Sequence, residues 1–388
     1  MPKIDSVRIK DVDSSLSTKG GRTLEVRCGS HTFTTPTRPL STMDISAKSY
    51  LGYRGELKSD IAALAIDFSG KRKEYFLKRN GVLAKAEKRL QSLSDASFGL
   101  PSMPIIQVDP FLSTERAHFK LAFEMERSIE GIDVLSMPGV IGNGRAFESM
   151  VTDWCSSSED VGLGSAIQLS LAEDVDSFSE RLDILAELSK TDSFQVLNIQ
   201  YAPIHKCRQQ LATLWAKRED ICAIINCIGV TSPPSHGNVG LVPDEETFLL
   251  QNGFDMITKK VHSVSPKYMA YLSMQPGIQS LDQVDDFRIA RHSAATSIRK
   301  SLWNSMSHPP ECGCSVCKGQ TREELIERFA YLDNGDISKS GLRYYSVLHD
   351  HQSDMQELEV FRRYTSSDGA KEYDQRIEEC LSELKSVI

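Results

Sequence analysis

The chain has 388 residues, of which 40% are hydrophobic and 25% charged, a composition typical of globular proteins in water. No apolar run reaches the roughly 18 residues of a membrane span, and the first residues show no apolar signal segment, so we expect a cytoplasmic protein without membrane contact. The net charge of −8 argues weakly against a nucleic-acid ligand without excluding one, because only the contact surface must be positive.

Short apolar runs alternate with amphipathic segments along most of the chain. Apolar residues recur every three or four positions in 82–91, 177–188 and 206–215, which predicts helices. Near-continuous apolar strands separated by helices indicate a parallel sheet that is covered on both faces. The predicted strands are 32–40, 61–67, 104–109, 165–172, 194–200, 222–230, 268–274 and 286–290.

Eight such units predict an α/β protein with a (β/α)8 TIM-like barrel, followed by a C-terminal helical subdomain. An open doubly wound sheet is the alternative, but no glycine-rich phosphate turn follows an early strand. We expect an N-terminal extension at 1–30, the barrel at 31–305 and the C-terminal helical subdomain at 306–388. Breaker-rich stretches predict insertions near 125–160 and 231–265.

Three cysteines lie within six residues, at Cys312, Cys314 and Cys317, and two histidines follow at His349 and His351. Zinc in structural sites takes four thiolate or imidazole ligands in a tetrahedron. A C-x-C-x-x-C turn supplies three of them, and a histidine from a distant segment supplies the fourth. The pattern predicts a structural Zn²⁺ and makes residues 306–388 a C-terminal zinc-binding helical subdomain. The remaining cysteines are scattered in apolar contexts typical of reduced, buried thiols.

The zinc motif, its place after the β/α units and the helical tail resemble the tRNA-guanine transglycosylase superfamily, including its branch that modifies DNA. Further segments support this resemblance in chain order. The run at 195–203 with Arg208 is similar to the family's "GIVQGG…DLR", and 223–230 is similar to "AIGGLSVG". The run at 268–276 is similar to "YLMGVGTP", and 104–111 occupies the place of "PILTDSGGF". The histidine in SVLH resembles "TIHN", which favours His349 over His351 or His308 as the fourth ligand.

The resemblance implies an exchange of guanine in DNA or tRNA for a 7-deazaguanine base. In the family, an aspartate attacks C1′ and forms a covalent glycosyl ester, and a second carboxylate transfers the proton. Asp109 occupies the place of the acid/base aspartate, with a turn-starting role before Pro110 as the alternative. Arg288 stands where the nucleophile belongs, so Asp286, two residues earlier on the same strand face, is the candidate nucleophile. Asp282 is another candidate, and a chain without a nucleophile stays open.

The resemblance also implies substrate contacts at Glu173, Gln200, Asn226 and Arg288. Glu173 follows a strand at the point where the family reads the guanine edge with a carboxylate, although it and Asp174 also suit the start of a helix. Gln200 offers its amide to the base or ends a buried strand. Asn226 replaces a family glycine, which leaves less room for the base.

A basic stretch precedes and follows the cysteine cluster and suits contacts with phosphates, although each residue alone suits an ordinary solvated helix face. Its members are Arg288, Arg291, His292, Arg299, Lys300, Lys318, Arg322, Arg328 and Lys339. The expected partners are therefore DNA or tRNA and the 7-deazaguanine base. The resemblance further implies a homodimer or accessory proteins. The alternatives are a catalytically inactive nucleic-acid-binding paralogue and an unrelated barrel enzyme with a structural zinc.

Overall fold

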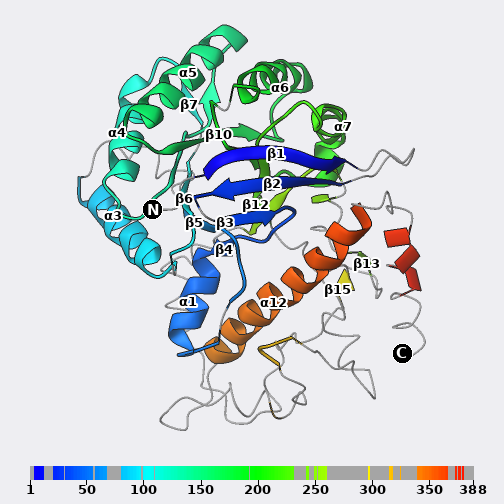
Figure 1. Ribbon diagram of the computed structural model, residues 1–388. Helices are drawn as coiled ribbons and strands as arrows, with labels where there is room; N and C mark the ends of the chain where they lie inside the picture. Colours follow the sequence, from blue (N-terminus) through cyan, green and yellow to red (C-terminus); the bar gives the residue numbers. More distant parts are fainter. Residues whose placement is uncertain are drawn as a thin grey trace.

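Figure 1 shows the computed structural model of the chain. The residues that it describes are 4–12, 21–29, 31–55, 57–67, 80–97, 99–108, 110–191, 193–230, 242–243, 249–250, 252–259, 296–297, 314–317, 324, 339–365, 372–373, 375–376 and 378–379. In this part of the chain, no helix is both long and apolar enough to cross a membrane. Within these residues the protein is a mixed α/β structure with parallel sheets.

The N-terminal segment forms an antiparallel sheet of β1 (Ile4–Val12), β2 (Arg22–Cys28) and β3 (His31–Thr34). Buried and exposed residues alternate from Leu24 to Cys28, as expected for a strand with one face on the core. The expected first barrel strand at 32–40 is wrong in its bounds. Its start is β3, and its end belongs to β4 (Leu40–Ser41), which pairs parallel with the next strand.

Two parallel sheets form the body of the protein. The first contains β4, β5 (Ala62–Asp67) and β6 (Ser102–Gln107) in that order. The second has the order β14-β12-β11-β10-β8. Its strands are β8 (Val134–Ser136), β10 (Gly164–Ser170), β11 (Val196–Gln200), β12 (Ile224–Val230) and β14 (Met256–Lys259). The predicted strands at 61–67, 104–109, 165–172, 194–200 and 222–230 are thus confirmed within two residues at each end.

The edges of the two sheets are joined by backbone hydrogen bonds on both sides. Asp133 N, just before β8, donates to Ser102 O at the start of β6 over 2.9 Å. On the other side, Thr37 forms a parallel bridge with Met256 of β14, and Thr37 N donates to Asp255 O over 2.9 Å. These contacts connect the start of β6 to the residue before β8, and the segment before β4 to the start of β14.

Helices follow most of the parallel strands and cover one face of the sheets (Figure 1). Short two-residue strands β7 (Phe111–Leu112) and β9 (Val140–Ile141) pair after β6 and β8. Strands β13 (Val242–Pro243) and β15 (Thr296–Ser297) pair antiparallel with each other and form a separate two-stranded sheet. The helices are α1 (Thr42–Tyr50), α3 (Asn80–Asp95), α4 (Arg116–Arg127), α5 (Gly144–Asp160), α6 (Val175–Ser189), the short η2 (Ile204–Lys206), α7 (Arg208–Lys217) and α12 (Lys339–Thr365).

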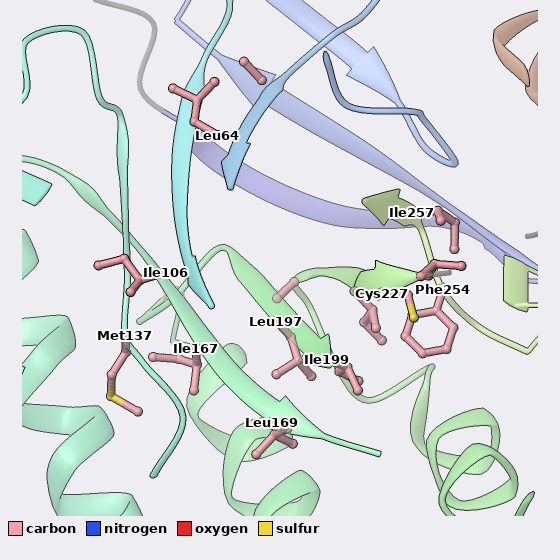
Figure 2. Close-up of a cluster of buried hydrophobic side chains, with 14 of the residues drawn as sticks. Leu64, Ile106, Met137, Ile167, Leu169, Leu197, Ile199, Cys227, Phe254 and Ile257 are labelled. Atoms are coloured by element: carbon pink, nitrogen blue, oxygen red, sulfur yellow. The ribbon is translucent and has the colours of Figure 1, made fainter. Parts of the chain in front are cut away.

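The two faces of each parallel strand differ. On β11, Leu197 and Ile199 pack with the helices in one large apolar cluster (Figure 2), whereas Val196 belongs to a second cluster shared with the β1–β2–β3 sheet. Asn198 and Gln200 have the same parity as Val196 and lie on its face, because side chains alternate along a strand. We call this second side the inner face.

Two segments expected as insertions contain strands of the five-stranded sheet. Residues 125–160 include β8, which pairs with β10, and the following helix α5. Residues 231–265 include β14, which pairs with β12. Both strands have fewer than five residues, too few for an apolar run to stand out from its surroundings. The expected strands at 268–274 and 286–290 lie outside the described residues, and the domain boundaries stay a prediction.

Glu126 of α4 is fully buried. Its Oε2 accepts a hydrogen bond from Ser136 N over 2.6 Å, while Oε1 has no partner among the residues that the structure describes. Burial raises the pKa of Glu126 well above its ordinary value, and the bond from Ser136 offsets only part of this effect. The folded state therefore holds a proton on Glu126 more tightly than the unfolded chain does.

This makes Glu126 a source of pH-dependent stability. The free energy of unfolding is expected to be highest below about pH 4.3, where both states are protonated, and to fall as the pH rises toward the folded-state pKa. Glu126→Gln keeps an acceptor for Ser136 N without the charge, so we expect it to raise the free energy of unfolding at pH 8 by about 1–3 kcal/mol. Urea unfolding at pH 5 and pH 8 measures this, with the exposed Glu124→Gln as control. An equal gain at both pH values would contradict the prediction.

Candidate metal centre and strand-end residues

Cys314, Cys317 and His349 form a buried group whose ligand atoms all lie within 4.8 Å of one another. The two cysteines lie in the tight turn 314–317, and His349 projects from the long helix α12. His349 Nδ1 is 3.5 Å from Cys314 Sγ and 3.2 Å from Cys317 Sγ. This group of two thiols and one imidazole could hold a metal ion.

The distances suit a tetrahedral ion. Zinc lies about 2.3 Å from sulfur and about 2.0 Å from nitrogen, which places neighbouring ligand atoms about 3.5 Å apart. The backbone N of Cys317 also donates to Cys314 Sγ over 3.4 Å, which helps to orient this sulfur within the turn. Three donors of this kind are the minimum set of a structural site, and a fourth completes the tetrahedron.

Tyr345 lies one helical turn before His349 on α12 and is fully buried. Its hydroxyl is 2.8 Å from Cys317 Sγ, and its ring stacks on the His349 ring with centroids 6.4 Å apart. A hydroxyl that donates to a ligating sulfur orients that ligand and spreads its negative charge. Tyr345 therefore belongs to the surroundings that position the group.

The structure distinguishes the two histidines. His351, the fallback ligand, faces away from the cysteines: its Nε2 is 2.8 Å from Lys58 O and its Nδ1 is 3.4 Å from Asp44 Oδ2. The expected choice of His349 is thus supported by its place beside both sulfurs. Cys312, the third expected cysteine ligand, and His308 lie outside the described residues.

Helix α12 packs beside α1 (Figure 1), and buried charges hold it against α1 and the segment before β4. Arg38 pairs with Asp354 of α12 and with Asp44 of α1, and Arg362 Nε donates to Pro36 O over 2.8 Å. Burial alone would favour the neutral acid, but His351 and Arg38 together lower the pKa of Asp44 below its usual range. Helix α12, which carries His349, is therefore anchored to α1 and to the segment before β4.

Glu173, an expected substrate contact, follows β10 and has both carboxylate oxygens engaged. Oε1 accepts from Ser170 N over 3.1 Å and Oε2 from Arg181 over 2.9 Å. Arg181 also donates to Val140 O and Gly142 O. Burial raises the pKa of Glu173, and Arg181 offsets part of that effect. These contacts tie the loop after β8 to α6, so Glu173 has a structural function here. Its neighbour Asp174 caps α6 by accepting from Ser177 N over 2.9 Å.

Asn226, another expected substrate contact, is fully buried in the middle of β12. Its Nδ2 donates to Asn198 Oδ1 over 2.8 Å, and its Oδ1 accepts from Thr258 over 3.0 Å. These bonds link β11, β12 and β14 across the inner face. The side chain is satisfied within the sheet, and its role in substrate binding stays a prediction.

Gln200, the remaining described candidate, ends β11. Its Oε1 accepts from Gln168 Nε2 of β10 over 3.4 Å. Gln107, the last residue of β6, also lies on the inner face, since it has the parity of Met103 and Ile105. The structure thus gathers three glutamines near the carboxyl ends of three parallel strands.

Four residues of the predicted catalytic machinery, Asp109, Asp282, Asp286 and Arg288, lie outside the described residues, as does most of the basic stretch. The structure also shows three residues that the sequence reading missed: Gln107, Gln168 and Tyr345. Each glutamine interrupts an apolar run at or near the carboxyl end of a strand, which is the signal that could have identified it.

No model of a known protein family matches this chain, and no curated protein matches it either. Among solved structures, the chain is similar to the YdjI aldolase from Escherichia coli, with 10% sequence identity and a TM-score of 0.36. That match covers 58% of this chain and 76% of the aldolase chain. Similarity at this level is too low to indicate a shared activity.

Proposed function

We propose that the parallel strands close into a (β/α)8 barrel that carries a zinc-binding helical subdomain. The hydrogen bonds at both edges of the sheets support closure, as does a contact across the inner face. A Cβ at Gly229 of β12 would lie 3.6 Å from Gln107 Nε2 of β6, although these strands belong to different sheets. Closure brings the carboxyl ends of all strands together, where barrel enzymes place their sites.

The protein then acts as a base-exchange transglycosylase that replaces guanine in DNA or tRNA with a 7-deazaguanine. The observation that carries this proposal is the group of Cys314, Cys317 and His349. It joins the cysteine cluster to the histidine of the transglycosylase-like motif, in a helix that packs on α1. Cys312 completes four zinc ligands, and the ion has a structural role that holds α12 in place.

In this mechanism, Asp286 attacks C1′ of the target nucleoside, the glycosidic bond to guanine breaks, and a covalent aspartyl ester forms. Asp109 protonates the departing guanine and later accepts the proton of the incoming 7-deazaguanine, whose nitrogen displaces the ester. The exchange conserves the glycosidic bond, so it requires no redox cofactor. Arg288, on the strand face of Asp286, stabilises the carboxylate or binds a phosphate.

A second candidate is a catalytically inactive, zinc-containing nucleic-acid-binding paralogue. The engagement of Glu173 favours it, because both oxygens of this carboxylate are already bonded to Ser170 N and Arg181. The place of Arg288 where the family has its nucleophile favours it as well. In this case the basic stretch alone would bind the nucleic acid, and its affinity would fall steeply with salt.

Incorporation of radiolabelled guanine into DNA and tRNA, measured in parallel, separates the two candidates. We expect label in one polymer with the wild-type protein and background label with Asp286→Ala, because the ester cannot form without the carboxylate. Asp282→Ala serves as the matched control and should retain incorporation. Metal-loaded, folded wild-type protein that incorporates label into neither polymer would refute the exchange reaction and favour the binding-only paralogue.

A further inference from the structure

The short strands β7 and β9 pair with each other where the chain has left β6 and β8. Phe111 N donates to Gly139 O over 2.8 Å, and Ser113 N donates to Ile141 O over 2.9 Å. An isolated pair of strands is only marginally stable in water, so this very short pair requires support from its surroundings. The pair begins two residues after Asp109, the acid/base of the proposed reaction.

Arg181 of α6 binds the edge of β9 that faces away from β7. Its Nη1 donates to Val140 O over 2.9 Å, and its Nη2 donates to Gly142 O over 2.8 Å. The carbonyls of residues 139 and 141 accept from β7, and successive carbonyls of an extended backbone point in opposite directions. The guanidinium of Arg181 therefore takes the place that a further strand would have beside β9.

The same guanidinium is joined to the segment after β10. Arg181 Nη1 pairs with Glu173 Oε2 over 2.9 Å, and Glu173 Oε1 accepts from Ser170 N at the end of β10. The backbone O of Glu173 accepts from Gln210 Nε2 of α7 over 2.7 Å. Arg181 is 5% exposed and lies over the Phe147 ring of α5, with its Cζ 5.0 Å from the ring centroid. One buried side chain thus connects the segments that follow β6, β8 and β10 with one another and with α7.

A buried ion pair adds little stability compared with apolar side chains of the same volume, because both charges lose their water. What an arginine adds is geometry, since its rigid, planar fork of donors holds several acceptors in fixed places at once. We propose that Arg181 is a positioning residue of the proposed base exchange, which holds the segments after β6 and β8 together so that Asp109 is presented in one place. The role of Arg181 rests on the proposed function, because that reaction gives Asp109 a proton to transfer. It acts through the backbone of β9 and β7.

Hydrogen exchange of the full-length protein, followed by mass spectrometry of the peptides that contain residues 111–113, tests whether Arg181 holds these segments. Arg181→Lys keeps a positive charge beside Glu173 but cannot bind both carbonyls of β9 with a fork of donors. We expect residues 111–113 to exchange about ten- to hundredfold faster in this variant, through the lost hydrogen bonds, while β11 exchanges as in the wild type. The double variant Arg181→Met/Glu173→Gln leaves no unpaired buried charge and should show the same local change. Arg89→Lys, at an exposed position of α3, is the matched control.

Steady-state kinetics of guanine incorporation test whether this placement serves the reaction. A displaced acid/base slows the chemical step and leaves the binding of the nucleic acid unchanged. We therefore expect kcat of Arg181→Lys to fall by about ten- to hundredfold, with KM for the nucleic acid as in the wild type. Arg89→Lys should keep both constants. A raised KM with unchanged kcat in Arg181→Lys would show a role in binding and overturn the positioning role.

The failure of this positioning role can be told apart from the failure of the proposed reaction. Unchanged exchange at residues 111–113 in Arg181→Lys overturns the role whatever the incorporation assay shows. Faster exchange that is spread evenly over β10, β11 and β12 would show a general structural function and overturn it as well, as would faster local exchange with an unchanged kcat. Faster local exchange in a protein whose wild type incorporates no label supports Arg181 as the residue that holds these segments and overturns base exchange.

Discussion

Cys317→Ser is expected to abolish stoichiometric metal binding and to lower the thermal stability of the protein. Cys317 Sγ lies against both His349 Nδ1 and the Tyr345 hydroxyl, so its replacement removes a ligand from the centre of the group. A structural zinc contributes its binding free energy directly to folding, with about 10 kcal/mol or more measured in small zinc-binding peptides. In a chain whose helix α12 has further contacts, we expect a smaller but still large loss of several kcal/mol.

Metal content by plasma mass spectrometry and melting temperature with and without a chelator measure this effect. Cys222→Ser, outside the group, is the control and should retain one metal ion per chain. Tyr345→Phe should keep the ion but release it to a competing chelator about 10–100-fold more readily, because it removes only the bond to the ligating sulfur. Full metal content in Cys317→Ser would show that the group does not bind the ion.

Arg22→Met is expected to destabilise the fold by about 3–5 kcal/mol, since it leaves a buried carboxylate without its partner. Arg22 begins β2 and is 1% exposed. Its guanidinium binds both oxygens of Asp255 at 3.0 and 2.6 Å, and it also donates to Ile221 O, Ala223 O and Arg218 O. The N-terminal sheet is thereby locked to the segments that lead into β12 and β14.

Chemical unfolding of Arg22→Met measures this loss, with Arg27→Met on the same strand as the matched control because Arg27 is exposed. The double variant Arg22→Met/Asp255→Asn removes the unpaired charge and keeps an acceptor for Ile225 N, which Asp255 Oδ2 binds at 2.7 Å. We expect it to recover part of the loss. A single variant as stable as the control would refute the role of this ion pair.

Two buried ion pairs connect parts of the chain that are distant in sequence. Asp255, just before β14, pairs with Arg22 of β2, and Asp354 of α12 pairs with Arg38 of the segment before β4. These ion pairs hold the N-terminal sheet against the second parallel sheet and α12 against the segment before β4.

The residue types alone were enough to predict the central strands and the meeting of Cys314 and Cys317 with His349. Strands such as 222–230 are long runs of apolar and β-branched residues, which form buried parallel strands in most contexts. The cysteines are identifiable because thiols at such close spacing have few roles other than metal binding. The short strands β8 and β14 could not be recognised, because three or four residues show no periodicity and their pairing depends on longer neighbours.

Only the tertiary structure decided between the histidines and brought the glutamines together. His349 and His351 are separated by about 200° around α12, so the packing of that helix determines which imidazole meets the thiols. His349 faces Cys314 and Cys317, and His351 faces Asp44. Gln107, Gln168 and Gln200 come from three separate strands, and nothing local relates them. The sequence specifies which chemical groups are present, and sheet register and helix docking, which depend on contacts across the whole chain, specify which of them meet.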